Sequence, residues 1–186
     1  MSLTIPILLG SAREGRMSDK AAAYVAGLLE KRGANSRVID PREMLPRMDH
    51  QKVYADAWAL VMKDADALVI VSPEYNHGYP GTLKDIIDSA KIEYARKPVA
   101  ICGCSGGGLG GARVVEQLRE VMIELRMTPI HDAVYFSNHF QLWNEDGTIK
   151  DATYEERVHT MIDELFWYTE VLKSGRESRP FPTKKP

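Results

Sequence analysis

Short apolar runs alternate along this chain with longer segments in which apolar residues recur three or four positions apart. A short apolar run bounded by turn residues is typical of a buried strand, and the longer spacing is typical of a helix with one buried face. The runs that predict strands are residues 3–9, 36–39, 67–71, 98–102 and 128–137. The segments that predict helices are residues 18–32, 54–63, 82–92, 114–125 and 154–173. Five strands alternating with five helices indicate an α/β, doubly wound, five-stranded parallel sheet with helices on both faces.

The same pattern makes two detailed predictions. In the helix expected at residues 54–63, the apolar spacing places Ala57, Leu60 and Val61 toward the core. The segment at residues 40–48 contains two prolines and is expected to be a loop.

Length and charge restrict the class of protein. With 186 residues the chain is long enough for one domain, which we place at residues 1–175, followed by a tail at residues 176–186 that we expect to be mobile. A formal net charge of -2 gives no indication of binding to nucleic acid or to a membrane surface. The N-terminus lacks the basic and apolar regions of a signal peptide, so a cytoplasmic location is expected.

The two cysteines, Cys102 and Cys104, are separated by a single glycine. A disulfide at this spacing would be strained, and two thiols alone are a poor metal site. We therefore expect small buried side chains at the end of a strand, and no structural metal.

In sheets of this class a ligand binds beyond the carboxyl ends of the strands, where the strand order reverses. For the expected order 2-1-3-4-5, the first and third strands lie on either side of this reversal, and the fourth lies beside the third. The loops that follow these three strands are the richest in glycine and polar residues, so we expect them to form one site.

The loop after the third expected strand, residues 72–81, has the sequence SPEYNHGYPG. It contains two prolines, two glycines, two tyrosines, an amide and an imidazole, although a connection from strand to helix usually needs only about 2–6 residues. This excess of planar and hydrogen-bonding groups indicates a binding site for a flat ligand with polar edges.

The loop after the first expected strand precedes a helix and carries Ser11, Arg13, Arg16 and Ser18. Unpaired N–H groups at a helix N-terminus attract anions, and hydroxyl and guanidinium groups add hydrogen bonds to a phosphate. An ordinary turn, with Ser18 as the helix cap and two solvated arginines, explains the same residues. The chain lacks the GxxxxGK[ST] sequence of P-loop nucleotidases, so a phosphate site here would hold a phosphomonoester without cleaving it.

The loop after the fourth expected strand contains Ser105 and six glycines. GxGxxG at residues 106–111 matches a dinucleotide fingerprint, but that sequence normally follows the first strand of its fold. GxSxG at residues 103–107 matches the nucleophile elbow of a serine hydrolase. The acid and histidine that a hydrolase needs would come from Asp132, Asp151, His139 and His159. A wall of backbone N–H groups facing a planar ligand explains the loop better, because a hydrolase leaves the other two loops without a role.

Three motifs together resemble the NAD(P)H-dependent FMN reductases, a flavodoxin-like family of flavin, quinone, chromate and azo-dye reductases. They are GSxRxxR at residues 10–16, PEYNHGxPGxLK at residues 73–84 and GGxLGG at residues 106–111. The resemblance covers the chain from residue 3 to about residue 150. It implies a flavodoxin-like fold, tightly bound FMN, and NADPH or NADH as the co-substrate that reduces a small acceptor such as a flavin, quinone, azo compound or metal oxyanion.

The resemblance also implies which residues bind FMN. The phosphate would be bound by Ser11, Arg13, Arg16 and Ser18 together with the backbone of Met17. The ring edge would be lined by Pro73, Glu74, Tyr75, Asn76 and His77, and the pocket completed by Ser105 and Gly106. Family members are commonly homodimers or homotetramers.

No side chain is expected to be indispensable for proton transfer, and His77 is expected to shape its loop. The other histidines show no ligand spacing and are expected to be structural or exposed; they are His50, His131, His139 and His159. Two other classes of protein stay open beside the reductase: an FMN-binding electron carrier without its own NAD(P)H site, and a serine hydrolase that uses Ser105.

Overall fold

The computed structural model describes residues 2–44 and 51–179, with the backbone alone at residues 44 and 51–56. Its strands are β1 (Ile7–Leu9), β2 (Val38–Ile39), β3 (Leu68–Pro73), β4 (Pro98–Cys104), β5 (Thr128–Pro129) and β6 (Val134–Phe136). Its helices are α1 (Ser18–Lys31), α2 (Pro41–Met44), α3 (Gln51–Asp64), α4 (Gly81–Asp88), the 3-10 turn η2 (Ile92–Tyr94), α5 (Ala112–Glu124) and α6 (Thr153–Ser178).

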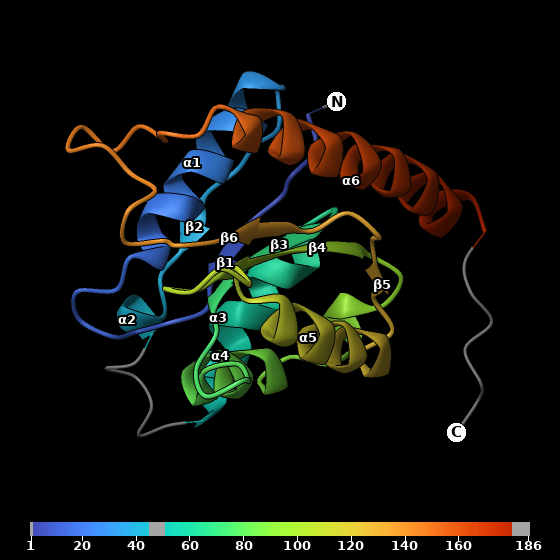
Figure 1. Cartoon of the computed structure of the whole chain (residues 1–186). Coiled ribbons are helices and arrows are strands. Elements are labelled where there is room, and N and C mark those ends of the chain that lie inside the picture. The colour runs from blue at the N-terminus through green and yellow to red at the C-terminus, as the bar shows by residue number, and fades with distance from the viewer. Residues whose placement is uncertain (1, 45–50, 180–186) are drawn as a thin grey trace.

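The strands form one parallel sheet in the order β2-β1-β3-β4-β5, and β6 also pairs with β4 (Figure 1). This is the flavodoxin-like order 2-1-3-4-5 that the sequence predicts. The first strand begins at Ile7 rather than at Leu3, because Pro6 has no N–H to donate to a ladder. The pairing continues more loosely before it, where Asn35 donates its N–H to the carbonyl of Leu3 at 2.8 Å.

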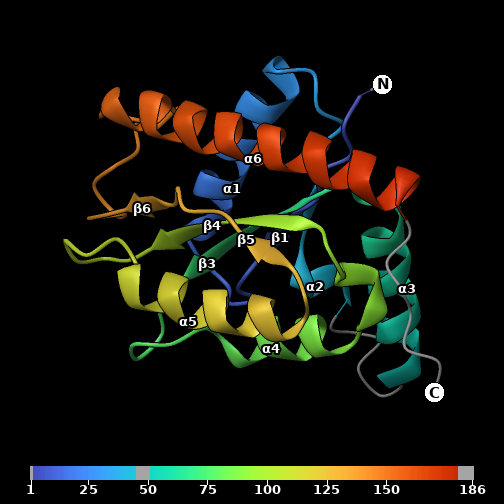
Figure 2. The ribbon, with the colours of Figure 1, turned by 90° about the vertical axis from the view of Figure 1, so that its right-hand side faces the viewer.

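Helices cover both faces of the sheet, with α1 and α6 on one face and α3, α4 and α5 on the other (Figures 1 and 2). Successive residues of a strand point to opposite faces. In β1, Ile7 and Leu9 therefore join the core under α1 and α6, whereas Leu8 joins the core under the other helices. This two-sided burial explains why the strands appear in the sequence as continuous apolar runs.

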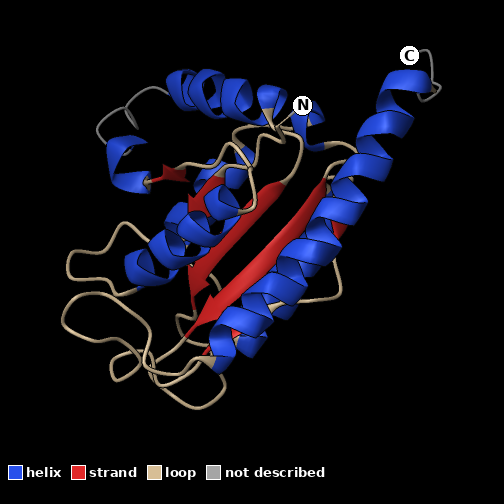
Figure 3. Ribbon diagram, turned by 90° about the horizontal axis from the view of Figure 1, so that it is seen from above, coloured by secondary structure: helices blue, strands red, loops and turns tan. Residues whose placement is uncertain are grey.

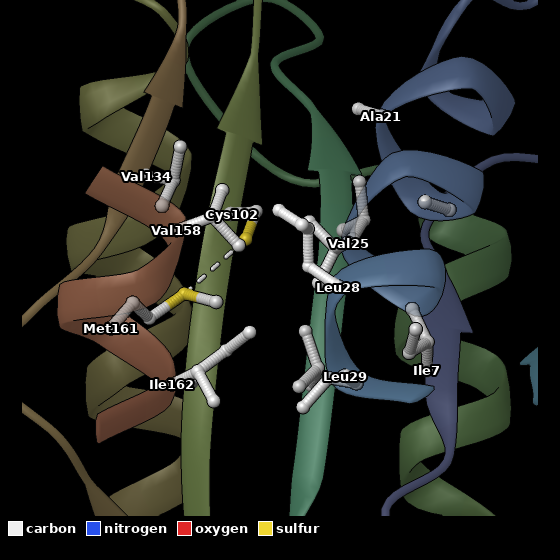
Figure 4. Close-up of a cluster of buried hydrophobic side chains, with 14 of the residues drawn as sticks. Ile7, Ala21, Val25, Leu28, Leu29, Cys102, Val134, Val158, Met161 and Ile162 are labelled. Carbon is white, nitrogen blue, oxygen red and sulfur yellow. Dashed lines mark hydrogen bonds between the residues drawn. The ribbon is translucent and has the colours of Figure 1, made fainter. Parts of the chain in front are cut away.

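The core between the sheet and α6 includes the first of the two cysteines (Figure 4). The Cys102 thiol lies 3.6 Å from the sulfur of Met161 on α6, and both residues are fully buried. Cys104 ends β4 and is also buried, and both thiols are free. The expectation of small buried side chains at a strand end is confirmed.

The fifth expected strand is split into β5 and β6, which pair with different parts of β4. The interruption lies where the backbone N–H groups of His131 and Asp132 donate to the two carboxylate oxygens of Glu164 on α6, at 3.2 and 2.6 Å. Because these N–H groups are bound to a helix, they are lost from the strand ladder.

The expected loop at residues 40–48 is wrong in its first part, since α2 occupies Pro41–Met44 and residues 45–48 lie outside the described residues. The carboxylate of Asp40 accepts the N–H of Arg42 at 2.9 Å, and proline is well suited to the first position of a helix. Asp40 therefore starts a short helix that the two prolines concealed.

The inward face of α3 also differs from its prediction. Val61 packs against the core as expected, but Leu60 is 61% exposed, whereas Trp58 and Met62 are fully buried. The buried face follows the i, i+4 pair of large side chains and is rotated from the one we inferred. At the other end of the chain, α6 continues beyond residue 173 to Ser178, and residues 180–186 lie outside the described part.

The loops that follow β1, β3, β4 and β6 meet at one edge of the sheet, because parallel strands all have their carboxyl ends there (Figure 3). β1 and β3 are neighbours, yet the chain leaves them toward opposite sides of the sheet. This is the reversal of strand order at which ligands bind in such folds.

Candidate functional site

A cavity of about 240 Å³ opens at this edge, between the loops that follow β1, β3, β4 and β6. Its lining residues are Arg13, Gly15, Arg16, Met17, Ser18, Pro73, Glu74, Tyr75, Cys104, Ser105, Gly106, His139 and Phe140. The structure thus brings together the three loops that the sequence predicted to form one site. Of the predicted site residues, Ser11, Asn76 and His77 are not among the described lining residues.

Arg16 is held by protein groups rather than free in the cavity. Its side chain is only 4% exposed, and its Nη1 donates to Asp40 Oδ1 at 2.9 Å and to the carbonyl of Ser11 at 2.6 Å. Burial acts to raise the pKa of Asp40, but hydrogen bonds from Arg16 and Arg42 outweigh it and lower the pKa to about 2. The ion pair therefore fixes the first loop to the end of β2.

Two polar atoms of the first loop remain buried without a hydrogen-bond partner in the described structure: Arg16 Nε and Ser18 Oγ. Helix α1 begins beside them, and its N-cap, Met17, provides no side-chain hydrogen bond to the first N–H groups. Ser18 is the first helical residue, so it does not act as the cap. Buried donors without partners, at the positive end of a helix dipole, are suited to an anion.

Arg13 supplies the free positive charge of the loop. Its side chain is exposed, lines the cavity and has no ion-pair partner among the described residues, whereas Arg16 is neutralised by Asp40. The backbone N–H of Arg13 donates to Ser11 Oγ at 3.1 Å, which holds the turn in place. A phosphomonoester is an anion that this combination of donors and one free cation fits.

The second loop is shaped by a tight turn from Tyr75 to Gly78. These two residues exchange backbone hydrogen bonds of 2.9 Å in both directions, and Asn76 and His77 between them have φ values of 50° and 69°. Positive φ at both central positions is the geometry of a type I′ turn. Asn76 and His77 therefore form the turn, which agrees with the expectation that His77 shapes its loop. The contact of these two residues with the edge of a flavin ring stays a prediction.

Glu74 joins the second loop to the start of α5. Its Oε1 accepts from Arg113 Nε at 2.7 Å, its Oε2 accepts the backbone N–H of Arg113, and its side chain is 5% exposed. Its own N–H donates to the carbonyl of Cys104 at 3.0 Å. Since its charge is paired, Glu74 contributes a neutral wall to the cavity.

The third loop approaches the cavity with bare backbone. A Cβ on Gly103 would lie 2.6 Å from the carbonyl oxygen of Gly110, and Gly110 and Gly111 have φ of 59° and 84°. These glycines let the loop fold back over β4 so that Ser105 and Gly106 reach the cavity.

Comparison with known proteins decides the family. The sequence profile described as NADPH-dependent FMN reductase matches residues 3–141, which is most of the chain. The chain belongs to this family. Its members are FMN-dependent enzymes that use NAD(P)H, and this protein is accordingly an oxidoreductase with FMN as cofactor and a small molecule as electron acceptor.

Individual relatives agree with this assignment. An NAD(P)H-dependent FMN reductase of Saccharomyces cerevisiae is 30% identical over 153 residues, covering 69% of this chain and 78% of its own. A 2-hydroxy-1,4-benzoquinone reductase of Burkholderia sp. is 30% identical over 172 residues, covering 88% and 94%. The structure of FerB, an NAD(P)H:acceptor oxidoreductase from Paracoccus denitrificans, covers 90% of this chain and 98% of its own with a TM-score of 0.76 and 21% identity, which supports the fold.

The cavity is lined by two residues that the sequence analysis did not assign to the site, His139 and Phe140. They follow β6, where the sequence analysis expected no part of the site. Their position after a strand that pairs with β4 was a usable signal, because that strand ends at the same edge of the sheet as the others. Phe140 is 72% exposed and its ring lies against Gly106.

Of the residues of the hydrolase alternative, His139 lines the same cavity as Ser105, with its Nδ1 facing Trp143, whereas Asp132, Asp151 and His159 have other partners. Asp132 contacts His131, Asp151 accepts from Thr153, and His159 lies beside Arg32 and Glu155. Ser105 Oγ donates to the carbonyl of Gly107 at 3.0 Å. In residues 2–44 and 51–179 no hydrogen bond joins Ser105 to a histidine side chain.

The described residues contain no group of three or more histidine, cysteine, aspartate or glutamate side chains that could hold a metal ion. None of the helices described here is both long and apolar enough to span a bilayer.

Proposed function

We propose that the cavity between the four loops binds FMN, with its phosphate at the start of α1 and its ring system between the second and third loops. The observation that carries this proposal is the set of buried polar atoms left without partners, Arg16 Nε and Ser18 Oγ, at a helix N-terminus beside one free cation, Arg13. Leaving such groups unsatisfied costs about 1–3 kcal/mol each, and a phosphate satisfies them.

Each loop would have a separate task. Arg13, Ser18 and the Nε of Arg16 would donate to the phosphate, while the Nη1 of Arg16 holds the loop to Asp40 and Ser11 holds it to Tyr75. The ring system would be lined by Pro73, Glu74, Tyr75, Ser105 and Gly106, with Met17 at its phosphate end.

When bound, FMN accepts a hydride from NAD(P)H and passes electrons to the acceptor. Both substrates would use the open side of the cavity in turn, and Phe140, which lines the cavity and is largely exposed, would lie beside them. The acceptor would be a flavin, quinone, azo compound or metal oxyanion. A quinone is supported by the relative from Burkholderia, whose name is that of a benzoquinone reductase.

Assembly and location are part of the same proposal. Leu109 in the third loop and Phe140 in the cavity lining are large, exposed apolar side chains, which supports a homodimer or homotetramer that covers them. A cytoplasmic location is supported by the need for NAD(P)H and by the two free thiols, Cys102 and Cys104, which suit a reducing compartment. Light scattering coupled to gel filtration tests the oligomeric state directly.

The decisive experiment is spectroscopic. Purified protein soaked with FMN and then freed of excess ligand should retain the flavin absorbance, and anaerobic NADPH or NADH should bleach it. Arg13→Ala should weaken FMN binding about tenfold and leave riboflavin binding unchanged, because riboflavin has no phosphate. Arg37→Ala is the matched control, since Arg37 is also exposed but lies at the other end of β1, beside Thr4 and Pro6.

A colourless protein after soaking with FMN contradicts the proposal. So does an Arg13→Ala variant that binds FMN as tightly as the wild type. Flavin that is bound but that neither NADPH nor NADH bleaches indicates the electron carrier instead.

A further inference from the structure

We propose that His139 is a further ligand of the FMN phosphate and donates a hydrogen bond to it from Nε2. The inference rests on the proposed FMN site. His139 lines the cavity, is only 4% exposed, and its Nε2 is buried without a hydrogen-bond partner in the described structure.

The neighbouring tryptophan determines which ring nitrogen carries the proton. Trp143 Nε1 lies 3.4 Å from His139 Nδ1, and an indole N–H can only donate. Nδ1 of the imidazole must therefore be the acceptor, so the proton of the neutral ring is on Nε2. Burial lowers the pKa of His139, partly opposed by the nearby backbone of Met17 and by Asp19, so the buried site favours the neutral ring. The unpartnered atom is thus a buried N–H donor.

The position of the ring favours the phosphate over the flavin ring. The groups that act on His139 electrostatically are Met17, Asp19 and Lys20, all at the start of α1 where the anion would lie. The next residue, Phe140, is directed instead to Gly106 in the third loop. His139 would then contact the phosphate of FMN, and the next residue, Phe140, would lie at its ring system.

His139 completes a pattern in the cavity. Three buried side-chain atoms of the lining lack partners, namely Arg16 Nε, Ser18 Oγ and His139 Nε2. Two belong to the first loop and one comes from the loop after β6, more than a hundred residues along the chain. A phosphate bound beside these atoms would take hydrogen bonds from two loops that are distant in the sequence.

Two substitutions of His139 test the Nε2 donor separately from the other contacts of the imidazole ring. In His139→Asn, the amide oxygen can take the place of Nδ1 and accept from Trp143, but no donor reaches the position of Nε2. In His139→Gln, the amide N–H reaches that position. We expect His139→Asn to weaken FMN binding to the apoprotein about tenfold, the change for one hydrogen bond to a charged group, with riboflavin affinity unchanged. His139→Gln should stay within about threefold of the wild type for both ligands.

The outcomes distinguish this inference from the proposed function. Wild-type protein that does not bind FMN ends the proposed function. Tight binding by the wild type and equally tight binding by His139→Asn overturns only the role of His139. Equal losses for FMN and riboflavin also overturn it, because they indicate a change in cavity shape.

A measurement without substitution covers the case in which the variants do not fold. In protein labelled with ¹⁵N-histidine, the His139 Nε2 should carry the proton, and its resonance should move on addition of FMN and stay in place on addition of riboflavin. A proton on Nδ1, or identical shifts with the two ligands, contradicts the proposal.

Discussion

Ser11 Oγ lies 2.7 Å from the hydroxyl of Tyr75, so the loop after β1 is hydrogen-bonded to the loop after β3. Ser11 is buried and also accepts the N–H of Arg13 at 3.1 Å. The residue that shapes the proposed phosphate cradle is therefore held by a residue of the proposed ring site. The two halves of the cavity are positioned relative to each other before any ligand arrives.

Removing the hydroxyl in Tyr75→Phe should lower both stability and FMN affinity. The loss of one neutral hydrogen bond predicts a fall of about 1 kcal/mol in the free energy of unfolding, measured by urea titration of the apoprotein. FMN affinity should fall about three- to fivefold, because the cradle is less well positioned. Tyr79→Phe is the control, since no hydrogen bond to the Tyr79 hydroxyl is found in the described structure; equal effects of the two changes would contradict the role of the Ser11 bond.

The sheet could be predicted from the sequence because its strands are buried on both faces and its helices have clear apolar sides. The split of the last strand could not be predicted. It depends on Glu164, whose carboxylate binds the N–H groups of His131 and Asp132 from α6. That contact exists only after α6 has packed on the sheet, and no local sequence pattern near residue 131 predicts it.

The candidate site, too, could be predicted from the sequence only in part. The loops could be located because they follow three apolar strands and carry polar and glycine residues. The role of Arg16 could not, because its partner Asp40 lies at the end of β2 and comes near only when β2 pairs with β1. His139 was not assigned to the FMN site because its loop has no glycine-rich or phosphate-binding motif.

The two cysteines should be unreactive in the folded protein. Burial raises the pKa of Cys102 to about 12 and that of Cys104 well above its usual range, so neither forms the nucleophilic thiolate near neutral pH. Ellman's reagent at about pH 8 should therefore titrate almost no thiol in the native protein and both thiols in guanidinium chloride. Rapid labelling of the native protein would contradict the burial of β4.

Gly103→Ala should destabilise the protein strongly and impair FMN binding. The added Cβ would lie 2.6 and 2.7 Å from the carbonyl oxygens of Gly110 and Gly111, which are backbone atoms and cannot rotate away. Overpacking of this kind costs about 1–3 kcal/mol, measurable by urea unfolding. Gly107→Ala is the matched control, because nothing lies within 4 Å of a Cβ there; a similar loss in both variants would exclude the close approach as the cause.

The ion pair between Arg16 and Asp40 should make stability depend on pH in the acid range. Because the pKa of Asp40 is lowered to about 2 in the fold from an ordinary value of 3.8, the folded state is favoured while the carboxylate is ionised. The stabilisation of about 2 kcal/mol is complete above about pH 4 and disappears as the pH falls toward 2.

Asp40→Asn removes this contribution and leaves the buried guanidinium of Arg16 without its counter-ion. We expect the free energy of unfolding to fall by about 2 kcal/mol near neutral pH, and the difference from the wild type to narrow steadily below about pH 4. Glu14→Gln, on the exposed part of the same loop, should show neither effect, since Glu14 has no ion pair among the described residues. A constant difference from pH 7 to pH 3 would mean that the carboxylate does not act through its charge, because only an ionised Asp40 can lose its stabilising effect by taking up a proton.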